Sequence, residues 1–380
     1  MTAADGARAD AARAAGTPAE GIRASEAQAG AEMTRAGMRQ AGGVRVAAID
    51  CGTNSLRLLV ADVDPAAGRL TDVDRRMEIV RLGQGVDATG RLAPVALDRT
   101  LRALSGYADI IRDRSAGAVR MVATSATRDA ANSADFVRGV TGVLGVAPEV
   151  LSGDEEARLS FTGATAEFAA ASMAPTGASA AGPAAASVAR RPADGLDPPY
   201  LVVDIGGGST EFVLGGAPGG APVSALSVDI GCVRLTERHL HSDPPAAAEM
   251  AAAVTDIGAA LDRVAAALPV RTARTLVGLA GSVTTVAALA LGLPRYDPAR
   301  IHHARISARQ VAGQTRALLG QTREQRAGLA VMHPGRVDVI GGGAMILDEV
   351  MRRFGFADVL VSEHDMLDGI AWALAGGGHR

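Results

Sequence analysis

Short apolar runs alternate along the chain with residues spaced as in amphipathic helices. Runs rich in Val, Leu and Ile are typical of buried strands. The predicted strands are 44–50, 56–62, 121–124, 200–204, 211–214 and 276–280. The helices are predicted behind Pro94, where Leu97, Leu101, Leu104, Ala108 and Ile111 share one face, and at 245–267, 308–319, 323–331, 344–354 and 365–376. For helix 245–267 we expect Ser242 or Asp243 as the cap, with Pro244 in the first turn. Alternation of this kind in both halves predicts two α/β domains.

Two low-complexity segments divide the chain. Residues 1–43 lack periodicity and contain repeated glycines, which predicts a disordered extension. Residues 168–189 carry no charge and include Pro175 and Pro183, so an Ala/Pro-rich interdomain linker is expected at 169–199. The domains are then predicted at 44–168 and 200–380, with the last helix, 365–376, as a candidate to pack back on the first domain.

One motif occurs in both predicted domains. Residues 50–55 and 204–209 share the pattern Asp-x-Gly-x-x-Ser, and each copy follows one apolar strand and precedes another. This repeat predicts a strand, a tight glycine turn and a returning strand in each domain.

Such turns are suited to binding phosphate. They bring consecutive backbone N–H groups and a hydroxyl to one concave side, and glycine lets a ligand approach the backbone closely. The strand-end carboxylates, Asp50 and Asp204, are then candidate ligands of Mg²⁺ or Mn²⁺, often through water. A plain hairpin turn is the alternative for either copy, and the two matched copies favour a phosphate site.

A third acidic segment begins the last helix before the linker. Ser152 and Glu155 have capping-box spacing, and acidic residues in a first turn also favour the helix dipole. Glu156 is not needed for capping, so it is a candidate to orient a water for attack on a terminal phosphorus. From spacing alone, a purely structural role is the stronger alternative.

All 38 basic residues are arginines. The absence of lysine excludes a Walker A loop, Schiff-base chemistry and a Ser-Lys dyad. Arginine forks match phosphate oxygens, and the candidates are Arg57, Arg128 and Arg158. Arg128 is preferred because it follows a strand and a run of hydroxyl side chains, although any single arginine is more often a solvated surface residue.

Two further glycine segments, 278–285 and 338–343, are expected to end strands and open helices. For 278–285, an anion-binding site and close helix–sheet packing explain the glycines equally well. For 338–343, we favour close packing. His239, His241, His302 and His303 lack metal-ligand spacing, and the dipeptide at 364–365 stands alone. The residues expected to bind phosphate are Asn54, Ser55, Arg57, Arg128, Gly206, Gly207, Gly208, Ser209, Gly281 and Ser282.

Composition restricts the partners. The net charge of −3 and the 3% aromatic content argue against a nucleic-acid binder. No export signal or run of about 18 to 20 apolar residues is present, which argues against a membrane partner. The two cysteines, Cys51 and Cys232, are far apart, so a cytoplasmic protein without disulfides is expected.

Five blocks in order resemble the exopolyphosphatase and guanosine pentaphosphate phosphatase family of the actin-like and sugar-kinase-like superfamily. The blocks are 48–55, 123–128, 152–158, 204–211 and 338–343, and the segment 227–234 resembles short actinobacterial forms. The resemblance implies two ribonuclease-H-like domains around a central cleft. It also implies an enzyme that removes the terminal phosphate of inorganic polyphosphate or the 5′ γ-phosphate of guanosine pentaphosphate.

The resemblance further implies roles for single residues. Glu156 corresponds to the family's catalytic base, while Asp204 and Glu211 serve the metal and the attacking water. The chain ends soon after Trp372, without the C-terminal helical domain with which larger members grip long chains, so short chains are expected. The same cleft could instead belong to a catalytically weak, polyphosphate-binding regulator, or to a sugar or acetate kinase of the superfamily. A homodimer is left open.

Overall fold

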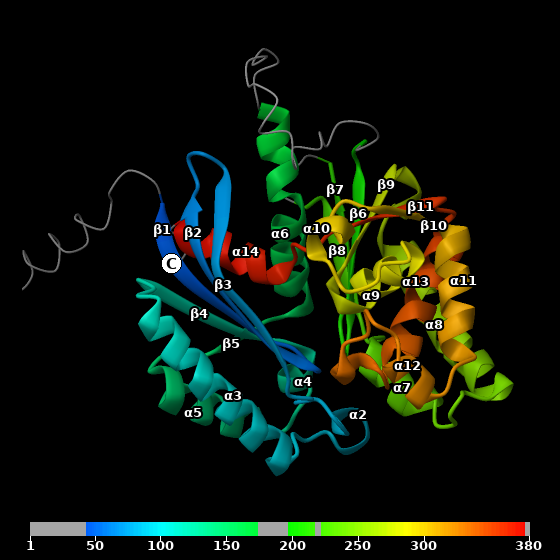
Figure 1. The fold of residues 1–380 in the computed structure, drawn as a ribbon, viewed down its shortest axis with the longest axis horizontal. Helices are drawn as coiled ribbons and strands as arrows, with labels where there is room; N and C mark the ends of the chain where they lie inside the picture. Colours follow the sequence, from blue (N-terminus) through cyan, green and yellow to red (C-terminus); the bar gives the residue numbers. More distant parts are fainter. Residues whose placement is uncertain (1–42, 174–196, 217–221, 377–380) are drawn as a thin grey trace, which may run out of the picture. The chain divides into compact units, whose positions relative to one another are not determined.

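Two β-sheets flanked by helices make up the part of the chain described by this computed structural model, residues 43–173, 197–216 and 222–376. Residues 45–380 form one unit by their internal contacts. Figure 1 shows the two sheets side by side, the first from the blue and cyan part of the chain and the second from the green to red part.

The first sheet has five strands in the order β3-β2-β1-β4-β5. Their bounds are β1 Val44–Cys51, β2 Ser55–Asp64, β3 Arg69–Ile79, β4 Ala118–Ala123 and β5 Glu149–Val150. β1 and β4 pair in parallel, as do β4 and β5, whereas β2 and β3 are antiparallel. β1 is almost fully buried, as its continuous apolar run predicts for a strand covered on both faces.

The second sheet repeats this order. Its strands run β8-β7-β6-β9-β11, and β10 adds an antiparallel edge beside β11. The bounds are β6 Tyr200–Ile205, β7 Thr210–Gly215, β8 Ser224–Val228, β9 Thr275–Leu279, β10 Arg305–Ser307 and β11 Asp358–Val361. The repeat seen in the sequence is therefore a repeat of topology, with the same hairpin at the centre of each sheet.

Helices cover the outer face of each sheet. On the first sheet these are α3, Pro94–Asp113, and α5, Ser133–Leu144, whose Leu104, Tyr107 and Phe136 are buried against β1 and β2. On the second sheet they are α8 Ala247–Ala267, α9 Ala280–Ala290, α11 Ala308–Leu319 and α13 Ile340–Phe354. Shorter helical segments are α2 Val86–Thr89, α4 Ser125–Arg128, α7 Cys232–His239, η1 Val270–Thr272, α10 Pro298–Ile301, α12 Arg323–Ala327 and η2 Pro334–Arg336.

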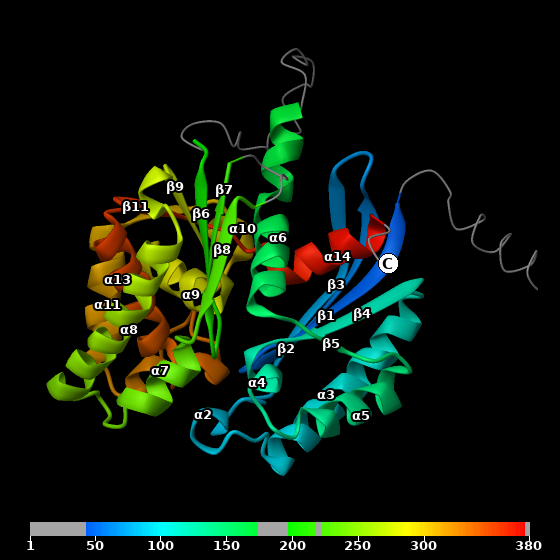
Figure 2. The ribbon, with the colours of Figure 1, turned by 180° about the vertical axis from the view of Figure 1, so that it is seen from behind.

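Two helices exchange between the sheets. α6, Gly153–Met173, follows the first sheet but packs Phe161 and its neighbours on the second. α14, Met366–Ala375, follows the second sheet but packs Leu367 and Ile370 on the first. Figures 1 and 2 show α6 (green) and α14 (red) meeting between the sheets. A Cβ on Gly163 would overlap the carbonyl oxygen of Asp365, so the two backbones are in contact here.

Several predicted boundaries are wrong for local reasons. Helix α8 is capped at Ala246, whose N–H donates to the Glu249 carboxylate at 2.8 Å, while Asp243 accepts the N–H of Arg323 instead of capping α8. The expected helix 323–331 ends at Ala327. No strand precedes the glycines of 338–343 in the described chain, because α13 already begins at Ile340 and contains them. Close packing explains these glycines, since a Cβ on Gly342 would lie 2.9 Å from the carbonyl oxygen of Cys232.

The predicted extension and most of the predicted linker lie outside the described residues. Two parts of the predicted 169–199 linker are described: 169–173, where α6 continues as a helix to Met173, and 197–199, which precede β6. Within the described chain, no helix combines the length and apolar character that a bilayer crossing requires.

Candidate functional site: a carboxylate-lined cavity

The two glycine turns, 52–55 and 206–209, have the same geometry and lie against each other. Each turn is closed by the same backbone hydrogen bond. The Gly52 N–H donates to the carbonyl of Ser55 at 3.0 Å, and the Gly206 N–H donates to the carbonyl of Ser209 at 3.1 Å. A Cβ on Gly207 would lie 2.9 Å from the Cβ of Thr53, and one on Gly208 would lie 2.6 Å from Ser125 Oγ. Larger residues at these two positions would push the turns apart, so the glycines are required by the contact between the two halves.

Most of the predicted site residues surround one cavity of about 100 Å³, called the first cavity. Both turns contribute to it, together with Glu156 of α6 and the start of α9. The predicted residues that line it are Asp50, Asn54, Ser55, Arg57, Glu156, Asp204, Gly206, Gly207, Ser209, Gly281 and Ser282. Residues up to 232 positions apart in the sequence are thus brought together at one place.

Three predicted residues lie beside the first cavity and not in its wall. Gly208 faces Thr53 and Ser125, and its carbonyl accepts the Arg234 Nε–H at 2.7 Å. Arg128 donates to the carbonyl of Leu151 at 2.9 Å and to Glu156 at 3.3 Å. Its predicted contact with phosphate stays a prediction, and its observed contact is with the candidate base.

Glu211, the third of these residues, is buried next to Asp204. The two residues are paired in the register of β6 and β7, and Ser227 donates to Glu211 at 2.8 Å. Burial and the negative charge of Asp204 raise the pKa of Glu211 to about 8. Glu211 can therefore hold a proton near neutral pH without touching the cavity directly.

Glu156 lies at the cavity wall in the first turn of α6. The predicted capping box forms with its neighbour: the Glu155 carboxylate accepts the N–H and the hydroxyl of Ser152, both at 2.8 Å. Glu156 is thus released from capping and is only 7% exposed. Burial and the nearby Glu211 carboxylate raise the pKa of Glu156 well above its usual range, despite the contact with Arg128. A carboxylate with a raised pKa is a stronger base once it is ionised.

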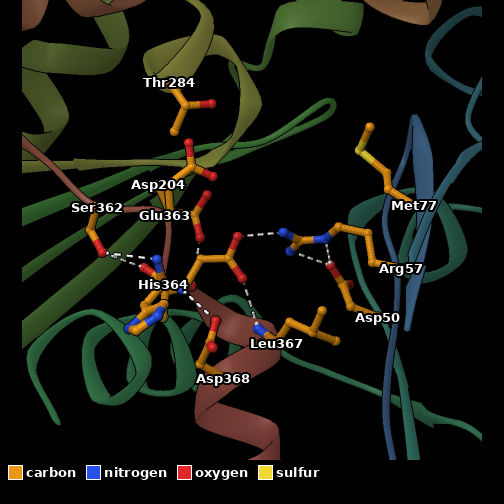
Figure 3. Close-up of polar contacts among 12 residues, drawn as sticks. Asp50, Arg57, Met77, Asp204, Thr284, Ser362, Glu363, His364, Leu367 and Asp368 are labelled. Atoms are coloured by element: carbon orange, nitrogen blue, oxygen red, sulfur yellow. Dashed lines mark hydrogen bonds and ion pairs between the residues drawn. The ribbon is translucent and has the colours of Figure 1, made fainter. Parts of the chain in front are cut away.

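Arg57 is held by two carboxylates. Its Nη2 donates to Asp50 at 2.6 Å, its Nε donates to the same oxygen at 3.0 Å, and its Nη1 donates to Asp365. Figure 3 shows Arg57 between Asp50 and the start of α14, near Leu367. The charge of Arg57 is therefore largely neutralised before any ligand binds.

The strand-end aspartates differ in their surroundings. Asp204 accepts the Ser160 hydroxyl at 2.7 Å, and burial together with the Asp365 charge raises the pKa of Asp204 to about 6. Asp50 is also buried, and its Oδ1 has no hydrogen-bond partner among the described residues. A buried carboxylate oxygen without a partner is costly unless a ligand satisfies it.

These carboxylates fit a hard divalent cation that is shared with a substrate. No group of three or more His, Cys, Asp or Glu side chains in the described parts of the chain is arranged to hold a metal by itself. Mg²⁺ is commonly held by one or two carboxylates, with waters and substrate phosphates completing its shell. Asp50 and Asp204 at the first cavity meet this requirement, and a complete protein cage is not needed.

A second, larger cavity adjoins the first. Its volume is about 440 Å³, and the two cavities share Arg57, Met77, Ala280, Gly281 and Arg336 in their walls. Ala280 has a positive φ of 67°, which is unusual for a residue with a side chain. The second cavity combines apolar residues such as Val331 and Met332 with Tyr296 and Glu363.

Sequence reasoning missed several residues of this region. Asp365 has no local signal beyond its isolated dipeptide with His364, and Ser160 is one hydroxyl within a helix. Arg336 precedes the 338–343 block but carries no motif of its own. All three act through contacts between distant segments, which spacing does not reveal.

Comparison with known proteins agrees with the fold. The family model described as the Ppx/GppA phosphatase family matches residues 59–174 and 187–374. Exopolyphosphatase 2 of Mycobacterium tuberculosis is 49% identical over 343 residues, covering 87% of this chain and 99% of that protein.

Two solved structures extend this similarity to three dimensions. The crystal structure of an exopolyphosphatase-like protein is 40% identical, with a TM-score of 0.78, covering 88% of this chain and 98% of that chain. The PPX-GPPA enzyme of Aquifex aeolicus is 28% identical, with a TM-score of 0.66, covering 87% and 99%. The predicted fold of two ribonuclease-H-like, actin-like domains is confirmed, and the chain belongs to the Ppx/GppA phosphatase family.

Proposed function

We propose that this protein is an exopolyphosphatase, which hydrolyses the terminal phosphate of inorganic polyphosphate. The observation that carries the proposal is the position of Glu156, a buried carboxylate free of capping, at the wall of a cavity formed by two phosphate-type turns. The similarity to an exopolyphosphatase over nearly the whole chain supports the same reaction.

The chemistry follows from these residues. The terminal phosphate lies in the first cavity, where the backbone of both turns and the hydroxyls of Ser55, Ser209 and Ser282 surround it. Glu156 accepts a proton from a water molecule. At the same time, the oxygen of this water forms a bond to the terminal phosphorus. The bridging P–O bond breaks, its electron pair stays with the remaining chain, and orthophosphate is released.

We propose that Mg²⁺ or Mn²⁺ assists the reaction, held by Asp50 and Asp204 together with substrate oxygens. When bound, the cation neutralises phosphate charge. The unpartnered Asp50 Oδ1 supports this role, and so does the pKa of Asp204, which burial and the nearby Asp365 charge raise, because a bound cation would stabilise both carboxylates in their ionised form.

The test is phosphate release from inorganic polyphosphates of graded length, measured with Mg²⁺, with Mn²⁺ and with a chelator. We expect release of orthophosphate from short chains and loss of activity with the chelator. Absence of phosphate release at every length, with either metal, would contradict the proposal. Transfer of phosphate to an added sugar or to acetate would identify a kinase instead.

Guanosine pentaphosphate is a second candidate substrate because of the second cavity. Its volume and its mixture of apolar residues with Tyr296 and Glu363 could hold a nucleoside while the phosphates enter the first cavity. A competition assay separates the candidates: the better substrate has the higher kcat/KM and suppresses hydrolysis of the other.

A cytoplasmic location is also a proposal. The two cysteines, Cys51 and Cys232, are both free and buried, which is the usual state of cysteines in a reducing compartment.

A further inference from the structure

Glu363 places a carboxylate in the wall of the second cavity. It lies in the turn between β11 and α14 and lines the second cavity but not the first. The Tyr296 hydroxyl donates to Glu363 Oε1 at 2.7 Å and lies 2.7 Å from Thr284 Oγ1. The Glu363 N–H donates to His302 Nδ1 at 3.1 Å. These contacts hold the carboxylate at the wall, and no arginine in the described chain forms an ion pair with it.

The arginines of the second cavity are mostly neutralised. Four arginines of the described chain line it, and three of them are paired with carboxylates. The pairs are Arg57 with Asp50 and Asp365, Arg75 with Asp72 and Asp368, and Arg76 with Asp74. The fourth, Arg336, lies at the boundary with the first cavity, and the charge of Glu363 opposes it. The second cavity therefore lacks the excess of positive charge that a long polyanion requires.

Much of the remaining wall of the second cavity is apolar. Ala330, Val331, Met332 and Leu367 line it. Apolar side chains offer phosphate oxygens neither a hydrogen bond nor a charge in exchange for the water that these oxygens lose. The wall around Glu363 is thus unfavourable for a buried anionic chain.

Under the proposed function, a phosphate chain approaches this wall. The terminal phosphate lies in the first cavity, and the following phosphates lead toward the second cavity, because the two cavities share Met77, Ala280 and Gly281 in their walls. Each further phosphate adds negative charge, and repulsion between like charges in a partly buried site is screened less than in water. A chain that extends beyond the shared wall brings its phosphates toward Glu363.

We propose that Glu363 limits the length of the polyphosphate chain that the enzyme cleaves efficiently. Its carboxylate repels the phosphates of a longer chain in the second cavity, whereas a chain that ends at the shared wall does not meet it. Repulsion of the wrong ligand is a general route to specificity. This inference rests on the proposed hydrolysis of polyphosphate and assigns the expected preference for short chains to one side chain.

The experiment compares Glu363→Gln with the parent on tripolyphosphate and on long-chain polyphosphate, at equal concentrations of chain ends. Glutamine has nearly the same shape and still accepts the Tyr296 hydrogen bond, so the variant removes only the charge. We expect the ratio of kcat/KM for the long chain to kcat/KM for tripolyphosphate to rise about tenfold. Assays at about pH 8 keep the carboxylate ionised, because burial raises the pKa of Glu363.

Asp109→Asn is the matched control. Asp109 is 65% exposed and pairs with Arg112 on α3, away from both cavities. This variant changes the net charge by the same amount and should keep the parent's ratio. Added salt gives a second readout, because screening should raise the ratio in the parent and have a smaller effect in Glu363→Gln.

Each outcome bears on a different statement. If the parent releases no phosphate from either substrate, the proposed function fails, whatever the variant does. If the parent is active and the ratio is unchanged or lower in Glu363→Gln, the limit on chain length is overturned while the function stands. A parent that cleaves the long chain as efficiently as tripolyphosphate also overturns the limit. Glu363→Ala replaces Glu363→Gln if the latter has a lower melting temperature than the parent.

Discussion

At the scale of single residues, buried charge decides what the site can do. Five carboxylates, Asp50, Glu156, Asp204, Glu211 and Asp365, are buried near one another. Arg57 compensates two of them and Arg128 contacts a third. Burial, together with this surplus of negative charge, raises the pKa values of Glu156, Asp204 and Glu211. A cation bound with the substrate would balance this surplus.

One buried carboxylate away from the site allows a test of pH-dependent stability. Asp74 on β3 pairs with Arg76 at 2.6 Å and Arg114 at 3.0 Å, and the hydrogen bond from Arg76 lowers its pKa. A lowered folded-state pKa stabilises the fold above the unfolded pKa of about 3.9 and ceases to do so as the pH falls through the folded value.

We therefore expect Asp74→Asn to lower the free energy of unfolding by about 1 kcal/mol at pH 7, because both arginines are half exposed. The difference from the parent should vanish below the folded pKa. Urea titrations at pH 7 and near pH 3 measure it, and an equal difference at both pH values would refute the assignment.

At the scale of elements, the hairpins were predictable from the sequence, whereas the particular residues that meet between elements were not. The continuous apolar runs of β1 and β6 and the Asp-x-Gly-x-x-Ser turns depend only on neighbours in the sequence, and both hairpins formed as predicted. Glu155 capping also formed as its spacing predicts. The start of α8 was misplaced because Asp243 binds Arg323, a residue far along the chain.

Asp365 illustrates why part of the site escaped prediction. It caps α14, where its carboxylate accepts the Leu367 N–H at 2.9 Å, and it reaches Arg57 only because α14 packs on the first sheet. No local pattern encodes this contact between the end of the chain and β2. Asp365 could be assigned to the site only once α14 was known to pack on the first sheet.

The crossing of α6 and α14 gives a prediction for the glycines at their contact. A Cβ on Gly163 would overlap the Asp365 carbonyl, and one on Gly369 would overlap the carbonyl of Leu159. Gly163→Ala must force the two helices apart, so we expect it to lower the free energy of unfolding by at least about 2 kcal/mol.

Gly106 of α3 is the matched control, because a Cβ there meets no atom within 4 Å. Gly106→Ala should raise stability by about 0.4–1 kcal/mol, as expected for a helical position that accepts alanine. Thermal or urea unfolding of both variants decides the matter. An equal change in the free energy of unfolding for Gly163→Ala and Gly106→Ala would show that α6 and α14 do not meet at Gly163.

At the scale of the whole unit of residues 45–380, ion pairs and hydrogen bonds join the halves beside the two glycine turns. Arg234 of α7 donates to the Gly208 carbonyl and pairs with Asp87 at 2.8 Å and with Asp129. Glu237 accepts the Gly85 N–H at 3.2 Å, and Arg81 pairs with Asp338 at 2.8 Å. These contacts hold the two glycine turns in register across the first cavity.

Removing Arg234 should therefore affect stability and substrate binding together. We expect Arg234→Met to lower the free energy of unfolding by about 2 kcal/mol and to raise KM, because the 206–209 turn loses a support. Arg102→Gln, which removes an exposed pair with Asp98 on α3, should change neither. Unfolding curves and steady-state kinetics test this, and an unchanged KM with reduced stability would mean that the contact is structural only.

The most direct test of the account is the comparison of Glu156→Gln with its neighbour Glu155→Gln on tripolyphosphate. Removing the base should lower kcat about 10³-fold in Glu156→Gln, while calorimetric binding of the substrate stays close to that of the parent. Glu155→Gln should remain active, since this side chain only caps α6. Near-parental turnover by Glu156→Gln would contradict the central claim that Glu156 activates the attacking water.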